Sequence, residues 1–327
     1  MLLLGLLLIA GSVRADDLVV VALAPAQGVF RDAFDTFQTN VERSFGEATD
    51  VKLLVGGEAG TEESMLSSLR RGRAQFGVLT VPGTSTAVPE LGLLMAPYLF
   101  DSFAEADFVL DEYLAEPVTA LFAAKGLVFI QWVDSGWWNL FAKQAIPTPE
   151  DGRGLRLRAA SGEAPVAFLR AFGADIIPLP FAEVIPGLQT GLIDGGATNT
   201  AMYVAMGMYQ HAPHLTLTRH AINPGVVLAN KRWFDGLSPG RQALVTQAFV
   251  SSEVLRAGVR QEARDALALV RAKGLMPYQP DAAELARWRA MSLPVQQQLV
   301  ERIGGASADL YRQIRFGKAA FHRQAAE

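Results

Sequence analysis

The sequence predicts an α/β protein of two lobes joined by a hinge, with one long helix towards its C-terminal end. Strand-like apolar runs alternate with helix-like segments through the first 135 residues, which is typical of a mostly parallel sheet. A second group of strands and helices follows from 136 to 223, and an apolar run at 224–230 leads the chain back to the first group. Two such crossings indicate a hinge, because a few residues at the crossings can absorb the closure of two lobes.

The first lobe is predicted from continuous apolar runs, which are typical of buried parallel strands. A helix is expected at 30–45, where phenylalanine and valine recur at helical spacing. Another helix is expected to begin near Thr61, whose hydroxyl can cap it while Glu62 and Glu63 suit its first turn. The predicted strands of this lobe lie at 18–25, 50–55, 75–80 and 127–132.

The second lobe is predicted to hold a short strand at 154–158, where apolar and charged residues alternate. Beyond it, Ser238 and Pro239 form a capping pair, and the next clear stop is Gly274. This spacing predicts a helix of about 35 residues, ~52 Å long, which is longer than one domain of this size needs. The predicted lobes are residues 16–135 plus 224–263 and residues 136–223 plus 264–327.

Composition excludes several classes of function. The 327 residues carry 29 basic and 33 acidic side chains, so there is no basic surface of the kind that binds nucleic acid. The absence of cysteine excludes disulfides, thiolate metal sites and cysteine nucleophiles. No GxSxG, GxGxxG or Walker motif is present, and Pro213 interrupts the pair His211 and His214. We therefore expect no enzyme activity, no cofactor and no metal site.

The N-terminus predicts export. Leu2–Ala10 is apolar, and Val13, Arg14 and Ala15 place small residues where signal peptidase cleaves, so residues 1–15 are expected to be a signal peptide removed before Asp16. A buried N-terminal helix is the alternative interpretation. The apolar run is shorter than the roughly 20 residues needed to cross a bilayer, and no other segment reaches that length without a charge or a proline. The mature protein is therefore expected to be periplasmic and not membrane-embedded.

The segment GLRLR, residues 154–158, contains the strongest candidate for a ligand contact. Alternation along this predicted strand places Arg156 and Arg158 on one face. A guanidinium held on a strand is well oriented to bind a carboxylate through two hydrogen bonds. The alternative is an ordinary surface arginine on an edge strand. The residues of this segment alone leave both interpretations open.

Several motifs follow one another in an order that identifies a family. After GLRLR come GADIIPLPFAEV (173–184) and LQTGLIDGG (188–196), and the chain also contains LLMAPYLF (93–100), IPTPEDGRG (146–154) and NKRWFDGLSPGRQ (230–242). This series resembles the DctP-type periplasmic solute-binding subunits of tripartite ATP-independent periplasmic (TRAP) transporters. The resemblance covers nearly the whole mature chain. It implies a two-lobed periplasmic binding protein, with a long helix across both lobes, that closes on an organic acid anion and delivers it to the small and large membrane subunits.

The resemblance also implies roles for individual residues. Arg158 stands at the family's ligand arginine, so we favour it as the anion contact. Arg156 stands at the family's usual lysine and is expected to be solvated. Trp138 stands where many relatives carry a second arginine. The missing second cation predicts a monocarboxylate ligand, because a second buried carboxylate would have no partner. The remaining expected ligand contacts are aromatic walls and polar groups, namely Trp137, Trp138, Phe181, Thr198, Asn199 and Asn223.

Alternatives remain for most of these positions. The two tryptophans and Phe181 could be core residues, because large aromatic side chains bury much area in any fold. Thr198 occupies the position of the family's ligand amide, and Asn199 could replace it only if the turn slips by one residue. Asp194 is expected to be a turn or capping residue. At the level of function, the alternatives are a periplasmic sensor component that binds the same ligand and an enzyme built on the same fold.

Overall fold

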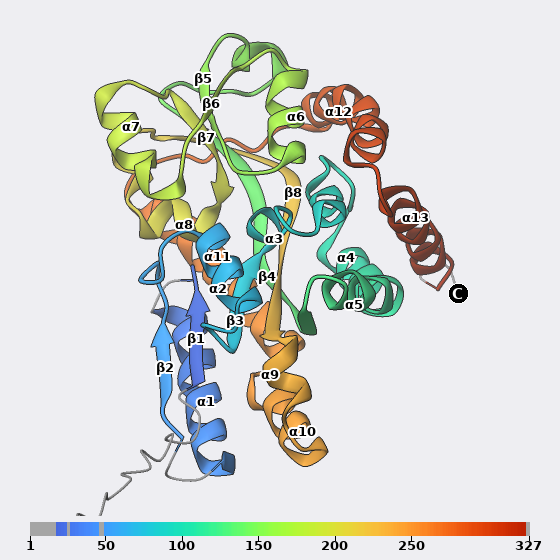
Figure 1. The fold of residues 1–327 in the computed structure, drawn as a ribbon. Helices are drawn as coiled ribbons and strands as arrows, with labels where there is room; N and C mark the ends of the chain where they lie inside the picture. The colour runs from blue at the N-terminus through green and yellow to red at the C-terminus, as the bar shows by residue number, and fades with distance from the viewer. Residues whose placement is uncertain (1–17, 25–26, 46–48, 325–327) are drawn as a thin grey trace, which may run out of the picture.

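Two long strands cross the whole molecule and join its two lobes (Figure 1). The computed structural model describes residues 18–24, 27–45 and 49–324. Its eight-stranded sheet has the order β2-β1-β3-β8-β4-β7-β5-β6. The central strands β4 (Leu127–Ala142) and β8 (His214–Asn230) are antiparallel and run through both lobes, as their green and yellow ribbons show. The predicted α/β fold with two lobes is confirmed, and the expected strands at 127–132 and 224–230 prove to be the first-lobe halves of these longer strands.

The first lobe follows the predicted pattern of strands and helices. Strand β1 (Leu18–Ala22) pairs in parallel with β2 (Val51–Leu54) and β3 (Phe76–Thr80). Helix α1 (Gly28–Phe45) buries its phenylalanines against this sheet, and α2 (Glu62–Arg70) begins after Thr61, whose side chain accepts a hydrogen bond from the backbone of the first turn. The remaining helices before β4 are α3 (Val81–Thr84), the 3₁₀ helix η1 (Pro89–Met95), α4 (Phe103–Val109), the π-helical turn η2 (Leu110–Leu114) and α5 (Ala115–Ala123).

The second lobe is built on three short strands beside β4. Strand β5 (Arg156–Ala159) lies between β6 (Asp175–Pro178) and β7 (Gly195–Asn199), and β7 pairs with β4. A Cβ on Gly195 would lie 2.1 Å from the carbonyl oxygen of Phe141, so only glycine lets β7 approach β4 this closely. The helices of this lobe are η3 (Pro149–Gly152), α6 (Glu163–Ala171), η4 (Phe181–Glu183), α7 (Val184–Thr190), α8 (Thr200–Ala205) and η5 (Met208–Gln210).

The predicted helix of about 35 residues is wrong as a continuous element. The structure has α9 (Lys231–Asp235), then α10 (Pro239–Ala248) after its Ser238 cap, and then α11 (Ser252–Ala272) after a second cap at Ser251. The break occurs because Phe249 turns into the core and packs edge-on against the first-lobe phenylalanines of α1. Helix α11 is still the long element expected, since it packs on α1 in the first lobe and on α8 in the second.

The hinge coincides with an irregularity in the two central strands. The pairing of β4 with β8 shifts between Asp134 and Trp137, opposite Pro224 and Ile222. Gly136 lies inside this shift with a φ of +85°, a conformation that a side chain would strain. The predicted lobe boundaries, 135/136 and 223/224, fall at this place. They remain a prediction, and the irregular backbone gives the strands a point at which to bend.

The C-terminal segment continues along the outside of both lobes. Helix α12 (Ala282–Ile303) packs against α6 of the second lobe and against η1 of the first. Helix α13 (Ser307–Gln324) then packs against α4, η2 and η1, which lie within residues 89–114 (Figure 1). The predicted second lobe included residues 264–327, whereas the main contacts of α13 are with elements predicted for the first lobe.

Two sequence expectations concern export and the membrane. The predicted signal peptide, residues 1–15, lies outside the described residues. Within the described part of the chain, no helix combines the length and the apolar character needed to cross a membrane.

Candidate ligand-binding site

Arg158 is a buried cation with no anionic partner. Its residue surface is 8% exposed, and its Nε donates a hydrogen bond to the carbonyl oxygen of Leu179 at 2.9 Å. The guanidinium carbon lies 5.6 Å from the ring centre of Phe181. Among the described residues, no carboxylate pairs with Arg158, and its two terminal nitrogens have no hydrogen-bond partner. Burial lowers the pKa of Arg158 to about 10. Because a buried charge is costly unless it is paired, this geometry favours a site for an anion.

A small cavity lies in front of Arg158 and is walled by both lobes. Its volume is about 10 Å³, and its lining includes Met95 from η1, Trp138 from β4 and Phe168 from α6. The lobes also touch directly, since Ser161 Oγ donates to Glu63 across the gap at 3.1 Å. A space of this size holds about one water molecule. An organic acid could therefore enter only if the lobes separate, as a hinged binder requires.

The two neighbouring tryptophans have different surroundings. Trp138 lines the cavity and is 7% exposed, and its buried indole Nε1–H has no hydrogen-bond partner among the described residues. Trp137 is not among the cavity-lining residues and packs on Phe103 of α4, with ring centres 5.2 Å apart. The structure therefore brings only Trp138 together with Arg158. Sequence reasoning could not choose between them, because the register of β4 is irregular here.

The expected polar contacts from β7 have other partners. Thr198 is buried opposite Asn139 of β4, and the β7 residue that lines the cavity is Ala197. Asn199 caps α8, since its Oδ1 accepts a hydrogen bond from Met202 N at 2.8 Å. Neither side chain reaches the cavity in this closed arrangement.

Asn223 lies at the hinge and not in the cavity wall. It is 4% exposed, and its Oδ1 has no hydrogen-bond partner among the described residues. Its backbone oxygen accepts a hydrogen bond from Ser135 Oγ at 2.8 Å, across the two central strands. This position agrees with the predicted hinge-side location and leaves its ligand contact a prediction.

Two other arginines of the second lobe, Arg156 and Arg219, are directed away from the cavity. Arg156 is exposed and binds Asp194 through Nε and Nη2 at 3.0 and 2.7 Å, which lowers the pKa of Asp194. Asp194 is therefore an ion-pair partner. Arg219 is also exposed and is not part of the cavity lining. Arg158 is the only lysine or arginine among the residues that line the cavity.

His220 lines the same cavity and was missed as a site residue by sequence reasoning. Its ring stacks on Phe168 at 4.1 Å with an interplanar angle of 10°, and its Nδ1 is hydrogen-bonded to Thr218 Oγ1 at 2.8 Å. Burial lowers the pKa of His220 to about 3, so the imidazole is neutral at pH 7. The sequence signal was a histidine two positions after a threonine on a buried strand, which by itself does not distinguish a site residue from a core residue.

The low pKa of His220 predicts acid sensitivity. In the unfolded protein the imidazole of His220 binds a proton below about pH 6.5, whereas in the folded protein it does so only near its lowered pKa. Protonation therefore favours the unfolded state, and the free energy of unfolding decreases as the pH falls below about 6.5. Between pH 7 and pH 5 we expect the free energy of unfolding to decrease by about 2 kcal/mol more in wild type than in His220→Phe. Urea unfolding at both pH values measures this difference. Equal losses in the two proteins would contradict a buried neutral imidazole.

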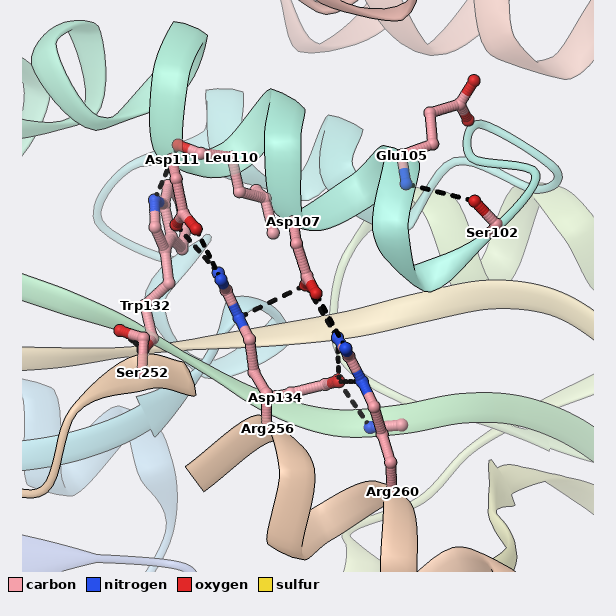
Figure 2. A network of polar contacts seen from close by, with 11 residues as sticks. Ser102, Glu105, Asp107, Leu110, Asp111, Trp132, Asp134, Ser252, Arg256 and Arg260 are labelled. Carbon is pink, nitrogen blue, oxygen red and sulfur yellow. Dashed lines mark hydrogen bonds and ion pairs between the residues drawn. The ribbon is translucent and has the colours of Figure 1, made fainter. Parts of the chain in front are cut away.

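A network of ion pairs fastens α11 to the first lobe beside the hinge (Figure 2). Arg260 binds both oxygens of Asp107 at 2.7 Å and also contacts Asp134 on β4 at 3.1 Å. Arg256 pairs with Asp111 and with Asp107. Burial raises the pKa of Asp134, an effect opposed by the hydrogen bond from the backbone of Gly136 and by Arg260. These contacts fix the first-lobe half of α11 at the point where the strands bend.

One group of side chains has the composition of a metal site. Oxygen and nitrogen atoms of Asp101, Glu105 and His322 lie within 4.8 Å of one another. Lys318 already contacts the two carboxylates at 3.0 and 3.1 Å, and His322 Nε2 lies 2.8 Å from Glu105. These contacts compensate the buried Glu105 and tie α13 to α4. We therefore interpret the group as an ion-pair cluster.

The chain is similar to known solute-binding proteins along most of its length. A model of the bacterial extracellular solute-binding protein family 7 matches residues 20–303. A solute-binding protein of Verminephrobacter eiseniae is 30% identical over 288 residues, which cover 88% of this chain and 84% of the relative. The 2,3-diketo-L-gulonate-binding periplasmic protein YiaO of Escherichia coli is 34% identical over 209 residues, which cover 63% of each chain.

A solved structure gives the same result for the fold. The sugar acid binding protein DctPAm from Advenella mimigardefordensis, crystallised with galactonate, matches with a TM-score of 0.86 and 25% identity. The match covers 92% of this chain and 98% of that chain. This chain therefore belongs to bacterial extracellular solute-binding protein family 7, the DctP family of TRAP-transporter solute-binding proteins.

Proposed function

We propose that the protein captures an organic monocarboxylate in the cavity beside Arg158 and delivers it to the membrane subunits of a TRAP transporter. The observation that carries this proposal is the buried guanidinium of Arg158, which has no anionic partner among the described residues and lies in a cavity walled by both lobes. A bound carboxylate would pair the charge and would be enclosed when the hinge closes. Because the family is exported, we place the protein in the periplasm.

The single cation supports one carboxylate in the ligand. The other arginines and lysines of the described chain do not line the cavity, and Trp138 supplies a neutral indole in place of a charge. A second carboxylate in this space would be buried without a cation, which is strongly unfavourable. The ligands named for two similar proteins, galactonate and 2,3-diketo-L-gulonate, each carry one carboxylate.

A thermal-shift screen tests this choice of ligand. Purified protein is heated with equal concentrations of monocarboxylates, including sugar acids and short aliphatic acids, and with succinate, malate and fumarate. A ligand present at 100 times its Kd stabilises the folded state by about 2.7 kcal/mol, which is readily detected. We expect at least one monocarboxylate to raise the melting temperature and the dicarboxylates to have no effect. A response to the C4-dicarboxylates alone would contradict the proposal.

A further inference from the structure

Two neutral polar groups share the cavity with Arg158. The first is the indole Nε1–H of Trp138, which is buried and has no hydrogen-bond partner among the described residues. The second is Nε2 of His220, because Nδ1 is already bonded to Thr218 and no hydrogen bond within the described chain reaches Nε2. A buried donor without a partner costs about 1–3 kcal/mol, so such groups are uncommon where nothing is bound.

The surroundings hold these groups in place. The ring of His220 is fixed on one face by Phe168 and at Nδ1 by Thr218. The backbone oxygen of His220 also accepts a hydrogen bond from Tyr98 N at 2.6 Å. Trp138 is held in β4 between β7 and β8. Side chains fixed in this way lose little entropy when they bind a ligand, which favours specific recognition.

We propose that Trp138 Nε1–H and His220 Nε2 bind a second, uncharged oxygen of the ligand, on the carbon next to the carboxylate. The site would then take a 2-hydroxy or 2-oxo monocarboxylate. The inference rests on the proposed function, because it assumes that Arg158 binds the carboxylate. Arg158, Trp138 and His220 all line the same small cavity, so we expect an oxygen bound by Trp138 and His220 to lie close to the carboxylate bound by Arg158. Neutral His220 can donate to an oxo oxygen or accept from a hydroxyl, depending on the tautomer.

The test compares acids that differ only at the second carbon. The probes are propanoate, lactate and pyruvate, and 4-methylpentanoate with its 2-hydroxy and 2-oxo derivatives, measured by calorimetry. The variants are Trp138→Phe and His220→Phe, which keep an aromatic ring and remove the polar group. Wild type is expected to prefer the oxygenated acid over its plain counterpart by at least about tenfold. Each variant should lose about 3- to 10-fold of that preference and bind the plain acid as wild type does.

The control variant is Trp137→Phe, which removes an indole outside the cavity lining and should leave the preference unchanged. If wild type binds plain and oxygenated acids equally, or if both cavity variants keep the full preference, this inference is wrong and the proposed function stands. If wild type binds none of these acids and responds only to dicarboxylates, both are wrong. Circular dichroism of each variant verifies that it is folded.

Discussion

Replacing Arg158 with methionine is expected to abolish ligand binding and leave the unliganded protein at least as stable as wild type. Truncating one partner of a buried, hydrogen-bonded charge pair costs about 2–5 kcal/mol of binding, which is roughly 30- to 5,000-fold in Kd. In the unliganded protein the guanidinium is buried without an anion, so its removal relieves an unfavourable desolvation. Calorimetry with an acid found in the thermal-shift screen measures the first effect, and urea unfolding measures the second.

The matched control lies two residues away on the same strand. Arg156→Met removes an exposed arginine that pairs with Asp194, and we expect unchanged ligand affinity and little change in stability, because exposed ion pairs contribute little. Arg158→Lys is a second informative variant, because an ammonium keeps the charge but cannot form two parallel hydrogen bonds with a carboxylate. Wild-type affinity in Arg158→Met would overturn the assignment of the anion site.

The largest loss of stability is expected from Arg260→Met. This change leaves Asp134, whose side chain is 4% exposed, with no cation, and it also removes both hydrogen bonds to Asp107. Breaking a buried ion pair from one side costs about 3–5 kcal/mol. The loss of unfolding free energy in Arg260→Met should be larger at pH 7 than at pH 5. Burial raises the pKa of Asp134, so at lower pH its carboxylate becomes protonated and is no longer an unpaired buried charge.

Urea unfolding with an exposed ion pair as the reference measures this effect. Arg31→Met disrupts the pair with Asp35, whose side chains are each 47% exposed, and it should cost less than about 1 kcal/mol. A similar small cost for Arg260→Met would show that the network beside the hinge does not fasten α11. If Arg260→Met shows the expected loss of stability but binds the ligand with wild-type affinity at low temperature, where it is folded, then Arg260 contributes to folding and not to ligand binding.

The first lobe could be predicted from the sequence because local signals determine it. The apolar runs of β1 and β3 are buried along most of their length, and the Thr61 and Ser238 caps fall at the predicted helix starts. For these elements the pattern within a few residues decided the outcome. Arg158 could be chosen over Arg156 only through the family resemblance, because alternation places both arginines on the same face of the strand.

The rest of the site depends on distant contacts that no local pattern reports. His220 and Met95 are 125 positions apart and meet at the cavity only because β8 and η1 pack together. The break before α11 depends on Phe249 finding the phenylalanines of α1. The choice of Trp138 over Trp137 depends on an irregularity in the pairing of β4 with β8. Tertiary packing decides all three, so sequence periodicity could not.

Native mass spectrometry with a mixture of acids tests the central claim most directly. Wild type and Arg158→Met are each mixed with equal concentrations of monocarboxylates and C4-dicarboxylates, and the mass of the bound acid is read from the complex. The account predicts a 1:1 complex of wild type with a monocarboxylate and no complex with Arg158→Met. A dicarboxylate in the wild-type complex, or the same complex in both proteins, would contradict it.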